Sequence, residues 1–141
     1  MTPKVALALG TMIEPLSVGP ISAAQVAAFA DRSGDKNPIH VDDATARRAG
    51  LSAPPVPGMQ IVAWLHAAAA RFDRGIDVTA MSTRFLAPVS VGETIVISGR
   101  IVQVDPGRDR AVMRLFVKTA AGALASIAEA TLVAPAGKGA A

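Results

Sequence analysis

The sequence predicts an α+β domain in which an antiparallel sheet curls around one long buried helix. Helical patterns and a proline-rich connector occupy the first half of the 141-residue chain, and strand patterns of period two occupy the second half. Helices followed by strands, rather than alternating with them, are typical of α+β proteins. One helical stretch is also apolar on nearly every side, and a helix of that kind is buried in the protein interior.

Two short helices are expected before the connector. Ser22 and Gln25 form a capping box at the start of the first helix, and Gly34 suits its end because glycine readily takes the left-handed conformation. Asp42 is the expected N-cap of the second helix. That helix ends with two arginines, which favour the negative end of the helix dipole, followed by Gly50.

The connector and the long helix follow. Three prolines between residues 53 and 58 fix an extended, rigid segment. The next stretch, Met59–Phe72, contains neither glycine nor proline and is apolar nearly all round. We therefore expect a helix that is buried on every side, with Gly75 as its end.

From residue 76 onward the apolar pattern changes to period two, which indicates strands. Proline, glycine, aspartate and small residues between the apolar runs indicate hairpin turns. We expect strands at about 77–86, 94–105, 110–119 and 123–133, turns at 105–109 and 119–122, and an added edge strand within 11–18.

Composition and charge exclude several classes of protein. The chain has no cysteine, so it has no disulfide scaffold, thiolate zinc site or cysteine nucleophile. Its net charge of +3 produces only a weak electrostatic field, and its longest run of basic residues is Arg47–Arg48. We therefore expect no nucleic-acid partner. No apolar run reaches the roughly 18 residues that cross a bilayer. Residues 1–10 lack the features of a signal peptide, so we expect a cytoplasmic protein without a membrane partner.

The length fits one domain. We expect that domain to span residues 11–134. Residues 1–10 would then be an N-terminal extension, and residues 135–141 a flexible tail of small residues.

The densest polar cluster is the loop Ser33–His40. Pro38 keeps the residue before it extended, so Asp35 and His40 can point at one spot from two sides of a turn. A carboxylate and an imidazole that share a spot can act as an acid/base pair on a water molecule. On spacing alone the simpler alternative is favoured, in which Asp35 caps a backbone turn and His40 is an ordinary polar core residue.

The same loop resembles the signature of the MaoC-like hydratases, a family that includes the (R)-specific enoyl-CoA hydratases. The core of the match is Gly-Asp-x-Asn-Pro-Ile-His at residues 34–40. The resemblance covers about residues 11–134 and implies the hotdog fold, a long helix wrapped by an antiparallel sheet. Its matching segments are Phe29–Asp42 with Ala46, the Pro-Gly-Met step at 57–59, Arg84–Val89 and Gly92-Glu93-Thr94.

The resemblance also implies roles for individual residues. Asp35 and His40 match the catalytic pair of the family, and Asn37 matches an asparagine that holds this loop and can contact the water. Gly58 matches the glycine that opens the long helix, whose N–H binds the thioester carbonyl. Unpaired N–H groups and the positive dipole end make that position suited to the negative charge that develops on the oxygen.

Other residues are candidates for binding the substrate. Pro57, Met59 and His66 are expected to border the acyl chain. Pro57 replaces a histidine that many family members have, and His66 stands where some carry a small hydroxyl residue. The simpler interpretation of His66 is a helix-face histidine bonded to backbone or placed at a subunit contact. Arg84 is a candidate contact for the phosphates of coenzyme A. Arg110, Arg114 and Lys118 are further candidates for this phosphate contact. A strand face that lies in solvent explains these three residues equally well.

The resemblance implies reversible hydration of trans-2-enoyl-CoA to (R)-3-hydroxyacyl-CoA, with no cofactor and with coenzyme A or a carrier-protein thioester as substrate. Two alternatives stay open: a 3-hydroxyacyl-carrier-protein dehydratase, and a non-catalytic acyl-thioester-binding subunit. A thioesterase fits the loop less well. No metal site is expected, although Asp35, His40, Asp42 and Asp43 lie close in sequence. One such domain leaves a sheet edge and part of the long helix uncovered, so we expect a homodimer with C₂ symmetry.

Overall fold

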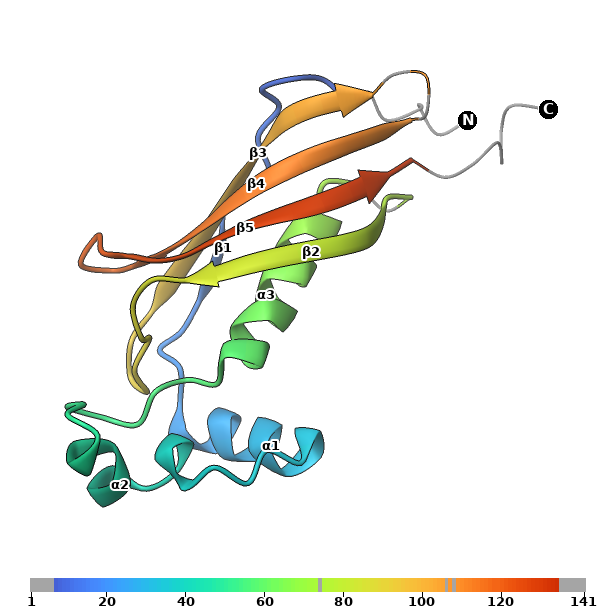
Figure 1. The fold of residues 1–141 in the computed structure, drawn as a ribbon. Helices are drawn as coiled ribbons and strands as arrows, with labels where there is room; N and C mark the ends of the chain where they lie inside the picture. The colour runs from blue at the N-terminus through green and yellow to red at the C-terminus, as the bar shows by residue number, and fades with distance from the viewer. Residues whose placement is uncertain (1–6, 74, 106, 108, 135–141) are drawn as a thin grey trace.

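The fold, seen in a computed structural model, is one five-stranded antiparallel sheet with a long helix against one face (Figure 1). The structure describes residues 7–73, 75–105, 107 and 109–134. Most of the expected N-terminal extension, residues 1–6, and the expected tail at 135–141 lie outside the described residues. The elements in chain order are β1 (Leu16–Val18), α1 (Ala23–Ser33), the 3-10 helix η1 (Pro38–His40), α2 (Asp43–Arg48), α3 (Gly58–Ala70), β2 (Asp77–Phe85), β3 (Ile95–Asp105), β4 (Arg110–Thr119) and β5 (Leu124–Val133).

The sheet has the strand order β1-β3-β4-β5-β2, and every pair is antiparallel. The bounds predicted for β2 to β5 are confirmed to within one residue. The expected edge strand within residues 11–18 is shorter than predicted: only Leu16–Val18 is a strand, and Met12 adds an isolated bridge to Arg100 of β3. The α+β class and the sheet wrapped on a helix are as predicted.

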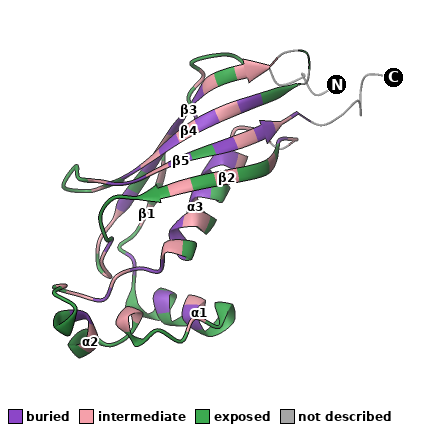
Figure 2. Ribbon diagram, viewed as in Figure 1, coloured by how far each residue is buried: buried purple, intermediate pink, exposed green. Residues whose placement is uncertain are grey.

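The core lies between α3 and the inner face of the sheet. Side chains alternate along the strands, so that one face of the sheet is buried against the helix. Leu65 of α3 is fully buried there, as are Ile97 and Leu115 of the two central strands. Figure 2 shows the buried positions along α3 and their alternation with less buried ones along β3 and β4.

The helix α3 differs from the prediction in two ways. It begins one residue earlier and ends at Ala70, with Arg71 as C-cap, so Gly75 does not end it. It is also not buried on every side, because the sheet covers only one side of it. Its other side is exposed. We refer to that surface as the bare side of α3, and its residues are Met59, Ala63, His66 and Ala67.

One edge of the sheet is also open. The strand β2 pairs with β5 only, and along its other edge it has no strand partner among the described residues. β2 spans nine residues, so a long row of backbone groups is unpaired there.

The helices α1, η1 and α2 lie beyond one end of the sheet (Figure 1). We refer to this part, residues 23–48, as the overhang. Its caps are those predicted: Ser22 Oγ accepts from Gln25 N (3.1 Å), and Ser22 N donates to Gln25 Oε1 (2.8 Å). Gly34 ends α1 with φ 75°, and Asp42 caps α2. No described helix is long and apolar enough to cross a bilayer.

Candidate active site

Short-range hydrogen bonds from side chains to backbone hold the loop between α1 and η1. Ser33 Oγ accepts from Asp35 N (3.4 Å), and Asp35 Oδ1 accepts from Asn37 N (3.1 Å). Asn37 Oδ1 then accepts from Ile39 N (3.1 Å) and caps η1. Bonds that span two residues are the usual way in which Ser, Asp and Asn fold tight turns. The backbone of Asn37 is extended before Pro38, as predicted, and its side chain stabilises the loop by capping η1.

The connector before α3 fixes the position of His40. The His40 Nδ1 atom lies 2.8 Å from the carbonyl oxygen of Pro55. Because a carbonyl oxygen can only accept, Nδ1 must carry a hydrogen. The connector residues on either side of Pro55 bond to segment 89–91. Since backbone groups alternate in direction along an extended chain, the Pro55 carbonyl points the other way, toward His40.

Asp35 and His40 come together in this arrangement. The His40 Nε2 atom lies 3.4 Å from Asp35 Oδ2, and the two side chains are 14% and 34% exposed. A neutral imidazole with hydrogen on Nδ1 has none on Nε2, so two acceptors face the same small volume. A water molecule at hydrogen-bond distance from both atoms can donate one hydrogen to each. The two oxygens of Asp35 therefore have separate tasks: Oδ1 holds the loop, and Oδ2 faces His40.

The free end of α3 lies directly after the connector that holds His40. Gly58 is its first residue, and Pro57, the N-cap, provides no side-chain cap. Within the described chain, the N–H groups of Gly58 and Met59 have no hydrogen-bond partner. Two N–H groups at a helix N-terminus form a site for an oxygen that carries negative charge. Pro55, the anchor of His40, precedes Gly58 by three positions.

Apolar side chains surround this helix end. A Cβ atom on Gly58 would lie 3.0 Å from the Phe85 ring tip, so that ring rests against the Gly58 backbone. Phe85 is 50% exposed and Met59 is 66% exposed. Two further exposed apolar residues are adjacent in sequence, Leu86 after Phe85 and Val41 after His40. Pro57 is buried. The predicted acyl-pocket residues Pro57 and Met59 thus lie at the helix end, one buried and one exposed.

Two predicted residues lie elsewhere. His66 is two turns after Gly58 on the bare side of α3, without a hydrogen-bond partner among the described residues. Arg84 pairs with Ile127 of β5, whereas the adjacent Phe85 faces the helix. Because side chains alternate along a strand, Arg84 projects from the outer face of the sheet. Within one chain, the structure does not bring Arg84 together with the Asp35–His40 pair.

The two acidic residues after Val41 belong to the start of α2. Asp42 accepts hydrogen bonds from the hydroxyl and the N–H of Thr45, and these bonds lower the pKa of its carboxyl. Asp43 lies in the first turn of α2. Among the residues that the structure describes, no three His, Asp or Glu side chains are placed to hold a metal ion.

The sequence analysis missed two contacts that shape the site. It did not assign the Pro55 carbonyl to His40, nor the Phe85 ring to Gly58. For Pro55 a signal exists: prolines have no N–H, so a proline-rich segment has more acceptors than donors and can bind a side chain that donates. For Phe85 the sequence offers only its place in the matching segment Arg84–Val89.

Comparisons with known proteins show which family the chain resembles. A family model described as MaoC like domain matches residues 7–122. The (R)-specific enoyl-CoA hydratase of Aeromonas caviae is 30% identical over 115 residues, which are 80% of this chain and 86% of that protein.

Solved structures give the same result. The (R)-hydratase from A. caviae involved in PHA biosynthesis superposes with a TM-score of 0.84 at 29% identity, covering 91% of this chain and 97% of that one. An R-hydratase from Pseudomonas aeruginosa superposes with a TM-score of 0.82 at 27% identity, covering 91% of this chain and 82% of that one.

The bond from His40 to Pro55 predicts the tautomer of the ring. We expect ¹⁵N-resolved NMR of the neutral imidazole to show hydrogen on Nδ1 and none on Nε2, because only that form can donate to the carbonyl. A neutral His40 with its hydrogen mainly on Nε2 would contradict the geometry.

Proposed function

The chain belongs to the MaoC-like family of hydratases and dehydratases, which are hydro-lyases, and from this we propose that it reversibly adds water to a trans-2-enoyl thioester to give the (R)-3-hydroxyacyl thioester. The observation that carries this proposal is the 3.4 Å approach of Asp35 and His40 in a loop anchored just before the free end of α3. The reaction adds one water molecule across the double bond between C2 and C3. It therefore requires no redox or group-transfer cofactor.

In the proposed reaction the pair binds and activates the water. The water oxygen forms a bond to C3, one of its protons passes to a member of the pair, and C2 receives a proton from the pair. The pair therefore holds the same number of protons before and after the reaction. Assigning the base to either Asp35 or His40 satisfies this balance. General acid/base catalysis of this kind contributes about 10² to 10⁴ in rate.

The free end of α3 is proposed to stabilise the charge. When the water oxygen attacks C3, negative charge develops on the thioester oxygen. The N–H of Gly58 is available for that oxygen, with the positive end of the helix dipole behind it. Phe85 and Met59 would border the acyl chain at this end. Asn37, whose side chain caps η1, would act by holding the loop that carries Asp35 and His40.

The donor of the acyl group, coenzyme A or a carrier protein, is a separate question from the chemistry. The reverse reaction on a carrier-protein thioester is a dehydration by the same two residues. Rates with one acyl chain on the two donors distinguish the hydratase from the dehydratase of acyl-chain synthesis. We propose coenzyme A as the donor because the similar hydratase of A. caviae is named as an enoyl-CoA hydratase.

We also propose that the chain acts as a homodimer. The open edge of β2 and the bare side of α3 leave unpaired backbone groups and apolar side chains in water. A second copy with the same two surfaces can cover both through C₂ symmetry. The exposed apolar side chains beside Gly58 would then be enclosed.

Removing either member of the pair should abolish most of the hydration activity. We expect Asp35→Asn and His40→Gln each to lower the rate of crotonyl-CoA hydration by about 100-fold or more, because each loses the group that exchanges a proton with water. Asp43→Asn, an exposed carboxylate in α2, is the matched control and should keep full activity. Activity unchanged in both pair variants would remove the mechanism. An inactive wild type that still binds enoyl-CoA would favour the acyl-thioester-binding subunit.

Gly58→Ala tests the free helix end. The backbone of Gly58 is not left-handed and the Phe85 ring tip can move, so we expect the variant to fold. We expect its kcat/KM to fall by about 10²-fold, because a methyl group beside the N–H displaces the thioester. Gly107→Ala, whose Cβ would meet only a carboxylate oxygen at 3.8 Å, is the control and should be unaffected. Equal activity in the two variants would exclude this role for Gly58.

The assembly is tested by mass. Light scattering should give twice the 14.4 kDa of one chain. Ala63→Glu, on the bare side of α3, should halve that mass because a carboxylate cannot be buried unpaired in the interface. Ala44→Glu in α2 is the matched exposed control and should stay dimeric. A wild-type mass of one chain would contradict the proposed dimer.

A further inference from the structure

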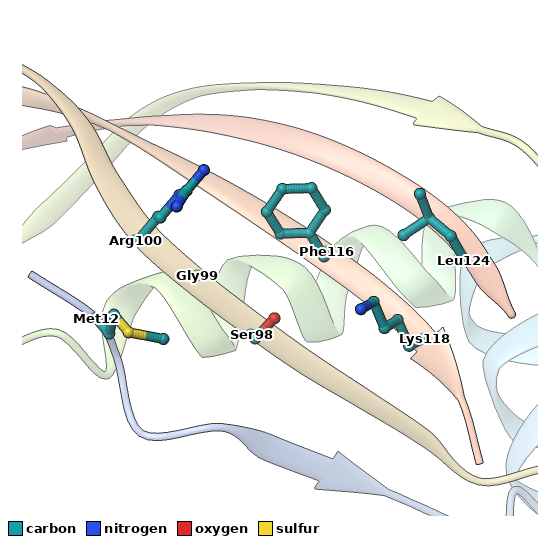
Figure 3. Close-up of a pocket in the computed structure, with 7 residues that line it drawn as sticks. All are labelled: Met12, Ser98, Gly99, Arg100, Phe116, Lys118 and Leu124. Atoms are coloured by element: carbon teal, nitrogen blue, oxygen red, sulfur yellow. The ribbon is translucent and has the colours of Figure 1, made fainter. Parts of the chain in front are cut away.

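A hollow lies on the outer face of the sheet, on the side opposite α3 (Figure 3). Its volume is about 380 Å³, within the range of small-molecule sites in proteins. Helix α3, which begins at Gly58, lies on the other face of the sheet, and Asp35 and His40 lie in the overhang beyond the end of the sheet. The residues that line it are Met12, Ser98, Gly99, Arg100, Phe116, Lys118 and Leu124.

The strand register explains why a hollow forms there. Ser98 of β3 lies opposite Phe116 of β4, and the small serine leaves space beside the large ring. Arg100 lies two residues beyond Ser98 along β3, and Lys118 lies two residues beyond Phe116 along β4, so the two cations flank this pair on the same face of the sheet. Figure 3 shows Phe116 between the two cationic side chains, with Leu124 beyond it. Apolar side chains thus lie between two positively charged ones.

The charges around the hollow are not balanced. Arg114 lies directly opposite Arg100, and like charges in such a pair repel. Glu129 compensates Arg114 at 3.0 Å. Arg100 and Lys118 have no ion-pair partner among the described residues, and no acidic side chain lines the hollow. An anion bound there would relieve this excess of positive charge.

We propose that this hollow binds a free medium-chain carboxylate. The alkyl chain lies against Met12, Phe116 and Leu124, and the carboxylate accepts hydrogen bonds from Arg100 or Lys118. Arginine suits a carboxylate because its planar group can donate two parallel hydrogen bonds. The Ser98 side chain marks the floor, where added volume would exclude the chain. This site is separate from the proposed hydration site, because none of the residues that line it belongs to the overhang or to α3.

Octanoate titrated into the full-length protein, followed by ¹H–¹⁵N NMR, tests this site. We expect saturable shifts at Ser98, Phe116 and Leu124. Ser98→Leu, which fills the floor, and Arg100→Gln should each weaken binding about tenfold or more. Arg47→Gln, an exposed arginine of α2, is the matched control and should leave binding unchanged. Uncharged octanol should bind more weakly than octanoate.

Three results would overturn the proposal. One is the absence of saturable shifts up to about 10 mM octanoate. The second is a set of shifts confined to residues near Gly58, which would place octanoate in the acyl site alone. The third is an affinity that neither Ser98→Leu nor Arg100→Gln changes, which would leave the face to another occupant such as an acidic protein segment. Crotonyl-CoA hydration by Ser98→Leu should equal that of the wild type, and this shows that a loss of octanoate binding is not a loss of fold.

Discussion

The hydrogen bond from His40 Nδ1 to the Pro55 carbonyl is the contact on which the candidate site depends. It joins the overhang to the connector before α3, two parts of the chain that do not share a strand or a helix. It fixes the tautomer of the ring and turns Nε2 toward Asp35. Because the same connector leads into α3, one bond ties the Asp35–His40 pair to a residue three positions before a free helix N-terminus.

The loop that carries the pair is built from local contacts, whereas the pair itself is not. Ser33, Asp35 and Asn37 each bind a backbone N–H two residues further on, so the sequence of the loop encodes its own shape. Asp35 takes part in this with one oxygen only. Asp35 thus supports a turn, as the simpler alternative stated, and it also faces His40, as the acid/base interpretation requires.

Most of the architecture was predictable because its signals are local. The capping box at Ser22, the end of α1 at Gly34 and the alternation along β4 each depend on a few neighbouring residues. The apolar pattern of α3 alone predicted burial on every side, because it shows that a helix is buried without showing by what; the partly uncovered helix was expected only from the fold that the resemblance implied. The sequence could not predict the contact between Phe85 and Gly58, since their closeness depends on how the sheet curls over the helix.

The overhang has a consequence for how heat inactivates the protein. Its helices expose most of their residues and contribute few buried side chains, whereas the sheet and α3 contain nearly the whole core (Figure 2). Segments with little buried apolar area open at a lower free energy than the core that carries them. Opening of the overhang breaks the contact with Pro55 while the sheet stays folded. The temperature at which the site is lost is thus set by the overhang and lies below the temperature at which the domain melts.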